Sequence, residues 1–305
     1  MTTLMAERAA APASPAQLSG PGDPSWPEST SEVNMTPPKK TDRGVSMALQ
    51  RVTEEVIKLV EAASNLPVAV SADPTLGTFA KVRIAPPSGP AHILTYNPTL
   101  GPNVDYAIVS QCGFVLRIYQ APPAERYDLA TNYRGRREIE KAVNDLAQTT
   151  DRLKLNREGR LDMAQRFYLG LTQQLRSIPV GLRVDDWIRQ SYPALAEQQK
   201  AVISRQLNDN AAVLAPDIHA LTPASVYEAI VKMNAAFAAF WAKVWGDPLL
   251  TAPYKATGHL AAGEALLALW EATPADPAHD KKLIDLWGEQ LGLKGWYDLL
   301  PRPTG

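Results

Sequence analysis

Apolar residues recur every three to four positions from residue 45 onward, which predicts an amphipathic first helix over residues 46–65. The apolar stripe of this helix consists of Leu49, Val52, Val56, Leu59, Val60 and Ala63. Three short runs with strand-like patterns follow, at residues 66–71, 79–85 and 92–98, and turns bearing Pro, Gly and Asp separate them. The pattern therefore predicts a helix followed by a small three-stranded sheet.

The next stretch, VDYAIVSQCGFVLRIYQ (residues 104–120), is apolar on nearly every side of a helix. A helix of this kind is expected to be buried between other layers. Asn103 or Asp105 can cap its start. Ser110 and Gln111 are the only polar side chains in its middle. Gly113 costs about 1 kcal/mol relative to alanine inside a helix, so we expect another group to approach the helix closely there.

The remainder of the chain shows helical patterns only, with prolines between them. The predicted helices lie near residues 134–153, 158–176, 183–191, 194–209, 223–245, 258–271 and 278–291. Six of the seven tryptophans lie in this second half, where packing between helices is their expected role. The predicted fold class is α+β: an N-terminal helix, a small three-stranded sheet, a central buried helix and a mainly α-helical C-terminal region.

Composition adds a predicted division of the chain and excludes some functions. Residues 1–44 are rich in Pro, Ser, Gly, Ala and Thr, which predicts a disordered arm. Residues 45–125 are the predicted α+β core, and residues 126–305 the helical region that packs on it. The net charge of −1 gives no general attraction to nucleic acid or to an anionic membrane, so neither is an expected partner.

Three further absences in the sequence bear on location. The single cysteine, Cys112, allows no intrachain disulfide and no multi-cysteine zinc site. No apolar run reaches the roughly 18 residues that a membrane-spanning helix needs. The first residues lack the continuous apolar segment of a secretory signal. We therefore expect a cytoplasmic protein.

The stretch SQCGF in the buried helix has the spacing of a metal-binding motif. Ser110 and Phe114 are separated by four residues, so they share one face of the helix. In the motif H-E-x-x-H of zincin metallopeptidases, two histidines at this spacing hold zinc and the glutamate acts as general base. SQCGF resembles a degenerate form of this motif, with Ser110 and Phe114 at the histidine positions and Gln111 at the glutamate position.

The order of elements around this helix supports the resemblance. A helix, a small sheet and then a buried helix, over residues 46–120, resemble compact zincin-like domains of the ImmA/IrrE kind. Serine is a poor zinc ligand, phenylalanine cannot bind a metal, and glutamine cannot accept a proton at neutral pH. The resemblance therefore implies a protein that holds no zinc or other cofactor and is catalytically inactive.

The same resemblance suggests two further sets of residues. A later helix supplies the third metal ligand in the family, and Asp185 or Asp186 can occupy that place. An acidic pair at a helix start is, however, also an ordinary partner of the helix dipole. The third strand, which includes His92, Ile93, Leu94, Thr95 and Tyr96, is expected to border the cleft as an edge strand and to accept an extended protein or peptide partner.

Three alternatives remain open from the sequence. In the first, Ser110 and Gln111 bond to neighbouring carbonyls and Phe114 is ordinary core. In the second, the chain is an active hydrolase that uses Asp185, Asp186, Cys112 or a histidine in the same cleft, although apolar surroundings leave a cysteine inert. In the third, the chain is a helical structural or assembly subunit, which the absence of a sheet before residue 100 would support. The four histidines are His92, His219, His259 and His279, and none is four residues from another.

Overall fold

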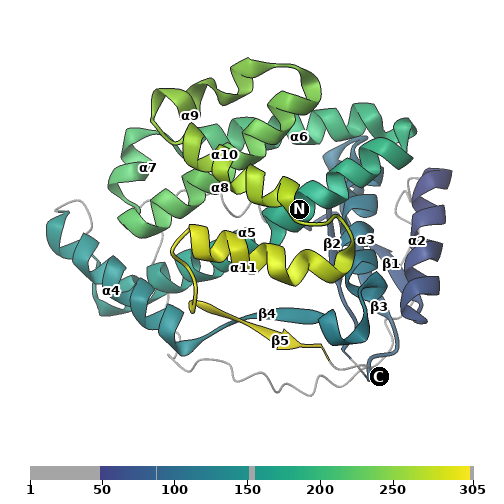
Figure 1. The fold of residues 1–305 in the computed structure, drawn as a ribbon. Coiled ribbons are helices and arrows are strands. Elements are labelled where there is room, and N and C mark those ends of the chain that lie inside the picture. Colours follow the sequence, from purple (N-terminus) through teal and green to yellow (C-terminus); the bar gives the residue numbers. More distant parts are fainter. Residues whose placement is uncertain (1–48, 87, 151–154, 303–305) are drawn as a thin grey trace.

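The computed structural model describes residues 49–86, 88–150 and 155–302, and it confirms the α+β class predicted from the sequence (Figure 1). The arm predicted over residues 1–44 lies outside the described residues. The helices are α2 (Arg51–Ser64), α3 (Val104–Gln120), α4 (Tyr133–Thr149), α5 (Arg157–Ser191), α6 (Ala196–Ala212), α7 (Pro216–Ala220), α8 (Ala224–Trp245), α9 (Ala252–Ala256), α10 (Leu260–Ala272) and α11 (Asp280–Gln290). The strands are β1 (Val68–Ala72), β2 (Ala80–Arg83), β3 (His92–Tyr96), β4 (Tyr127–Thr131) and β5 (Tyr297–Pro301). Short 3-10 helices include η3 (Pro123–Glu125) and η6 (Pro277–His279).

The predicted sheet forms from the first three strands. Strand β3 lies in the middle, parallel to β1 and antiparallel to β2. Alternate residues of β3 are buried, as a strand covered on one face requires: His92, Leu94 and Tyr96 are buried, and Ile93 and Thr95 are only partly buried. Three strands before residue 100 are present, so the observation that would have favoured an all-helical assembly subunit is not met.

Helices α2 and α3 pack against each other beside this sheet, on the right in Figure 1. Asn103 is the N-cap residue of α3, but its side chain makes no capping bond. The Asp105 carboxylate instead accepts hydrogen bonds from the Gln50 N–H (2.9 Å) and the Thr53 hydroxyl (2.5 Å). Because both donors lie at the start of α2, this carboxylate joins the first turns of two helices that are far apart in the sequence.

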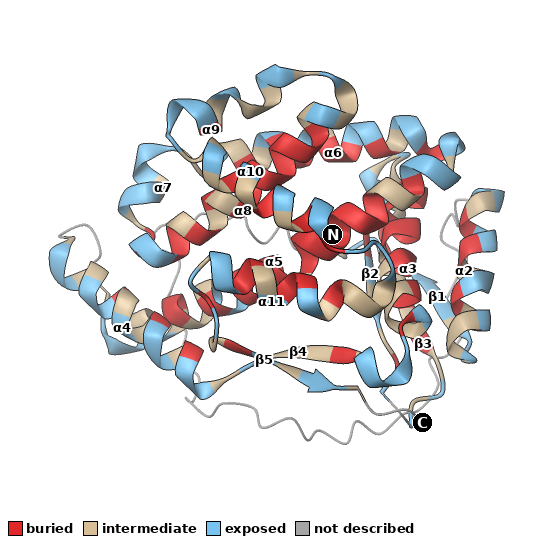
Figure 2. Cartoon of the chain, in the orientation of Figure 1, coloured by how far each residue is buried: buried red, intermediate tan, exposed pale blue. Residues whose placement is uncertain are grey.

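The helical region and the sheet region share one hydrophobic core. Buried residues of α3, α5, α8 and α11 belong to a single cluster that also includes residues of α2 and β3. Figure 2 shows that α3, α5 and α8 carry most of the buried surface, whereas α7 and α9 face outward. The fold therefore places α3, the helix that carries SQCGF, between the sheet and the long helix α5.

The prediction of separate helices at residues 158–176 and 183–191 is wrong. Residues 157–191 form one continuous helix, α5, with Pro179 inside it. Proline removes one helical hydrogen bond and usually bends or ends a helix. Here Leu175, Ile178 and Leu182 are fully buried on both sides of the proline, and the Trp270 indole N–H donates to the Pro179 carbonyl (3.0 Å). Tertiary packing stabilises the helix through a residue that local propensity disfavours.

The prediction of an entirely helical second half also needs correction. Strands β4 and β5 form a two-stranded antiparallel sheet, in which Tyr127 pairs with Pro301 and Thr131 pairs with Tyr297. Arg302 extends this link, because its guanidinium donates to the Asp128 carboxylate (2.6 Å) and to the carbonyl of Ala85 beyond β2 (2.7 Å). The end of the described chain is thereby joined to both sheets.

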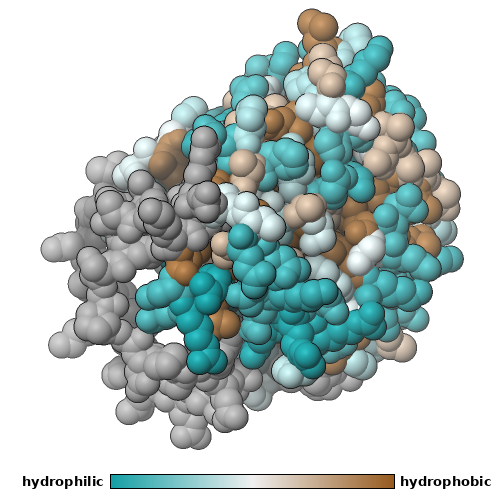
Figure 3. All heavy atoms as spheres, turned by 90° about the vertical axis from the view of Figure 1, so that its left-hand side faces the viewer, coloured by the Kyte–Doolittle hydropathy of each residue, from teal (hydrophilic) through white to brown (hydrophobic). Residues whose placement is uncertain are grey.

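Helices α8 and α10 pack closely through small residues. Ala235, Ala236, Ala238 and Ala239 are buried, and a Cβ on Gly263 of α10 would lie under 3 Å from Ala235. None of the described helices is long and apolar enough to cross a membrane. Figure 3 shows the face at the left of Figure 1, where hydrophobic residues lie in several small patches between hydrophilic ones.

Candidate functional site

Helix α3 has one face that packs on α5 and reaches the start of α11 through Arg117, and Ser110 lies on this face by helical spacing. Tyr106, Ser110, Gly113 and Arg117 follow one another at intervals of three or four residues. A Cβ on Gly113 would lie under 3 Å from the Val184 side chain of α5. The glycine therefore serves the close contact between two helices, which is the kind of close approach that the sequence predicts at this position.

The three positions of the degenerate motif have different surroundings. Ser110 is buried, and its hydroxyl makes no hydrogen bond to another described residue. Gln111 is partly buried. Phe114 is also partly buried and lines a hollow at the carboxyl-terminal half of α3. Ser110 thus lies in closed interior, and Phe114 lies at the hollow.

Asp185, the first candidate for a third metal ligand, is fully buried and faces α3. Its Oδ1 accepts a hydrogen bond from the Tyr106 hydroxyl (2.8 Å), and its backbone carbonyl accepts one from Gln199 of α6 (2.8 Å). Its Oδ2 has no partner among the described residues. Burial raises the pKa of this carboxyl to about 7, although the Tyr106 hydrogen bond opposes the shift. Asp185 is therefore bonded to Tyr106, which precedes Ser110 by one helical turn on α3, and both Asp185 and Ser110 are buried.

Asp186, the second candidate, has a different role at the surface. Its carboxylate accepts hydrogen bonds from Arg189 (2.8 Å) and from Gln190 (2.7 Å) on its own helix. Among the described residues, no group of three or more His, Cys, Asp or Glu side chains is arranged to hold a metal ion. Of the two candidates, the structure brings Asp185 to the face of α3 that carries Ser110. Asp186 instead forms its hydrogen bonds with other residues of α5.

The expectation that the third strand borders a cleft as an edge strand is wrong. Strand β3 is hydrogen-bonded on both sides, so His92, Ile93, Leu94, Thr95 and Tyr96 cannot pair with an added chain. Sequence order alone does not give spatial order, and here the last of three strands lies between the first two. The outer strands of this sheet are β1 and β2.

His92 has a structural role at the start of the middle strand of the sheet. Its Nδ1 accepts a hydrogen bond from the Ala85 N–H (3.0 Å), which places the ring proton on Nε2. Its ring meets the Tyr119 ring edge to face, with centroids 5.3 Å apart. Burial, and secondarily the nearby Arg302 charge, lower the pKa of His92. The imidazole is therefore held neutral between β2 and α3.

The other histidines lie beside partners of their own. His219 lies against the Tyr227 ring, His259 Nε2 is 3.3 Å from the Glu228 carboxylate, and His279 Nδ1 is 2.7 Å from the Asp276 carboxylate. His259 and His279 precede α10 and α11, but neither side chain makes a capping bond there.

Cys112 is expected to be an unreactive thiol. It is 1% exposed, and burial raises its pKa to about 12. The nucleophilic thiolate is therefore almost absent at neutral pH. We predict that an aromatic disulfide reagent at pH 8 reacts with Cys112 only as fast as the protein unfolds, and rapidly in urea. Rapid stoichiometric reaction of the folded protein would contradict this and would revive cysteine chemistry.

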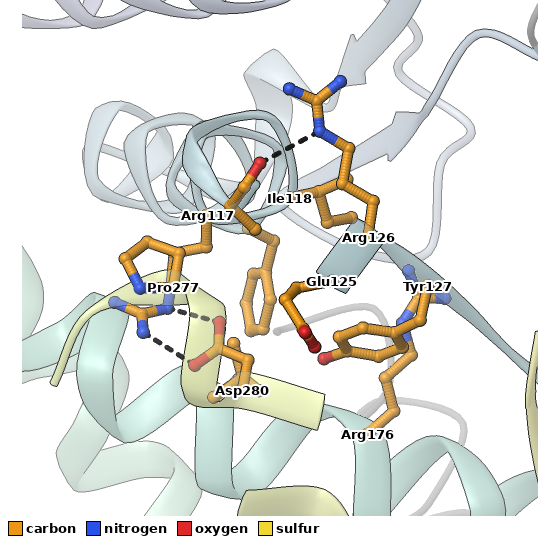
Figure 4. A pocket seen from close by; sticks show the side chains of 11 residues that line it. Arg117, Ile118, Glu125, Arg126, Tyr127, Arg176, Pro277 and Asp280 are labelled. Carbon is orange, nitrogen blue, oxygen red and sulfur yellow. Dashed lines mark hydrogen bonds and ion pairs between the residues drawn. The ribbon is translucent and has the colours of Figure 1, made fainter. Parts of the chain in front are cut away.

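The hollow beside Phe114 is formed by four segments that are distant in the sequence: the end of α3, η3 with the start of β4, the middle of α5, and η6 with the start of α11 (Figure 4). The hollow opens to solvent, and the space enclosed within it is small, about 20 Å³, which is enough for a water-sized group. The apolar part of the lining is Phe114, Ile118, Ala121, Val180 and Pro277. The polar part is Arg117, Glu125, Arg126, Tyr127, Arg176 and Asp280.

Two of the arginines in the hollow are already bonded. Arg117 makes a two-pronged pair with the buried Asp280 carboxylate (2.7 and 2.6 Å). Arg126 donates to the carbonyls of Ala121 and Tyr119, and Figure 4 shows it turned toward α3. Arg176 makes no such bond with another described residue. Sequence patterns do not reveal this group, because its members meet only when α3, α5 and α11 pack together.

Comparison with models of protein families, with curated proteins and with solved structures gives no match to this chain.

Proposed function

We propose that this chain is a catalytically inactive, metallopeptidase-like protein that acts by binding a protein or peptide. The order of elements supports a metallopeptidase-like core: helix α2, a three-stranded sheet and the buried helix α3 that carries SQCGF. The residues at the motif positions support inactivity, because none of them can hold zinc or accept the proton of a zinc-bound water.

The observation that carries the proposal is the environment of Ser110 and Asp185. These two residues stand at proposed ligand positions on α3 and α5, and both are buried in a packed helix interface. The Asp185 carboxylate accepts a hydrogen bond from the Tyr106 hydroxyl. A hydrolytic site needs an open position for substrate and water, which this interface does not offer.

Binding then requires a surface, and strand β2 is better placed for it than β3. Among the described strands β2 pairs only with β3. The Asn97 N–H donates to the Phe79 carbonyl (2.9 Å), so this opposed pair is hydrogen-bonded. In an antiparallel ladder, hydrogen-bonded and non-hydrogen-bonded pairs alternate. The pair of Val82 and Leu94 is therefore of the non-hydrogen-bonded kind, and the backbone N–H and C=O of Val82 point away from β3. Lys81 and Arg83 beside it are exposed. An extended chain with acidic side chains at alternate positions fits this edge.

Two measurements test the proposal. First, protein incubated with excess zinc and then desalted is expected to retain far less than one equivalent by elemental analysis. Second, Val82→Pro is expected to weaken binding of extended acidic peptides about tenfold, because it removes one outward N–H and leaves the β2–β3 ladder intact.

Val82→Ala is the matched control, since it loses the same side-chain packing and keeps the N–H. Equal peptide binding by both variants would place the contact elsewhere. Stoichiometric zinc, or peptide hydrolysis that disappears in Asp185→Ala, would contradict the inactive role and favour the hydrolase alternative.

A further inference from the structure

The hollow between α3, β4, α5 and α11 contains a cation without a counter-ion. Arg176 is partly buried, and it makes no hydrogen bond or ion pair with another described residue. Of the two acids in the lining, Asp280 is bound to Arg117. The other, Glu125, is exposed and lies beyond ion-pair distance of every described cation. The balance of charge in the hollow is three arginines against two carboxylates.

A hydrogen-bond donor lies in the same hollow. Burial, together with the nearby Asp280 charge, raises the pKa of Tyr127, so its hydroxyl keeps its proton at neutral pH. The charges of Arg176 and Arg117 act on this hydroxyl in the opposite direction, which places both cations within electrostatic reach of it. Figure 4 shows the Tyr127 hydroxyl turned toward the Glu125 carboxylate, with Arg176 rising from α5 beside the Tyr127 ring.

We propose that this hollow is an anion site, which receives one carboxylate or phosphate group through the Arg176 guanidinium and the Tyr127 hydroxyl. The apolar lining from Phe114, Val180 and Pro277 excludes water from one side and strengthens a charged hydrogen bond there. The planar fork of an arginine suits either anion. Glu125 repels the anion at the entrance and sets its affinity.

This inference refines the proposed binding role by naming the chemical group that a partner presents. It does not depend on the edge of β2. A carboxylate can come from an acidic side chain or a chain terminus, and a phosphate from a modified residue or a free nucleotide, so the two sources need separate probes.

The test uses the full chain at low ionic strength, with acetate and inorganic phosphate titrated separately by calorimetry. The Arg176 Nε–H signal, assigned by its loss in Arg176→Gln, provides the NMR readout. We expect saturable binding of at least one anion, weakened tenfold or more by Arg176→Gln, because a charge-assisted hydrogen bond is lost. Glu125→Gln is expected to strengthen binding a few-fold, since it removes the nearby negative charge.

Matched controls are Arg205→Gln and Glu264→Gln, which remove the same charges from α6 and α10, outside the lining of the hollow. A peptide with a free terminal carboxylate, compared with its amide, separates a terminus from a side chain.

Binding of neither anion, or binding unchanged by both Arg176→Gln and Glu125→Gln, would overturn the proposal. Should Arg176→Gln fail to fold, the anion affinities of Arg176→Lys and Glu125→Gln provide the test in its place. Loss of peptide binding in Val82→Pro with acetate binding unchanged would separate this site from the strand edge.

Discussion

Gly135→Ala is expected to destabilise the protein by about 3 kcal/mol, although it adds only one methyl group. A Cβ at Gly135 would lie under 3 Å from both the Trp296 carbonyl oxygen and the Tyr168 side chain. The first of these is backbone and cannot rotate away. The Tyr168 hydroxyl also accepts the Asn132 N–H (2.7 Å) and contacts the carbonyls of Asn132 and Trp296, so it is fixed as well.

The consequence of this clash extends beyond α4. Gly135 lies in the first turn of α4, where its N–H is capped by Asn132 (2.9 Å), directly after β4. Trp296 directly precedes β5. A shift of either backbone therefore separates the two strands that join the end of the described chain to its middle.

Gly170→Ala is the matched control for this prediction. Gly170 lies within α5, and a Cβ there would have no neighbouring atom within 4 Å. Alanine in place of a helical glycine is expected to raise the free energy of unfolding by about 0.5–1 kcal/mol. Urea unfolding, followed by circular dichroism, gives both values. Equal and small effects of the two substitutions would show that the α4–β5 contact is looser than the structure has it.

The first half of the fold is predictable because its signals are local. Strands β1, β2 and β3 lie within or next to the runs that alternation and turns mark, and α3 has the bounds that its apolar pattern predicts. The class and the buried position of α3 follow from the same patterns. The order of the strands does not, because pairing depends on which edges meet after the chain folds back.

The missed elements share a physical cause. Strands β4 and β5 have five residues each, and each gains its hydrogen bonds from a partner about 170 positions away in the chain. The continuity of α5 through Pro179 depends on buried neighbours and on the Trp270 indole. In each case a long-range contact outweighs the local preference of the sequence, which a short window cannot detect.

The candidate site was predictable only in part. The sequence predicts the buried helix that carries Ser110 and Phe114, and Asp185 bonds to Tyr106 of that helix. The hollow was not predictable, since Arg176, Tyr127 and Asp280 meet only through packing of distant segments. Gly113 was a readable signal of close approach, but the sequence could not tell whether a ligand or Val184 would approach.

The buried carboxyl of Asp185 leads to the second large effect, in the dependence of stability on pH. Its pKa is about 7 in the folded protein, compared with about 4 in an unfolded chain. The folded state therefore keeps a proton that the unfolded state releases between these values. The proton on Asp185 therefore contributes fully to the free energy of unfolding below pH 4, and this contribution is lost as the pH rises through 7.

Asp185→Asn removes this titration and keeps the acceptor for Tyr106. We expect the variant and the parent protein to be similarly stable near pH 4, and the variant to be more stable at pH 8 by on the order of 4 kcal/mol. The difference between the two curves isolates Asp185, because His92 and the other titrating groups contribute equally to both proteins.

Urea unfolding at a series of pH values from 4 to 8 provides the measurement. Asp186→Asn is the control, because it removes a neighbouring carboxylate whose pairing with Arg189 lies at the surface and is worth at most about 1 kcal/mol. Curves for Asp185→Asn and the parent that stay parallel from pH 5 to 8 would mean that Asp185 is solvated or already ionised. The interface between α3 and α5 would then contain room for water beside Ser110, which would favour the hydrolase alternative.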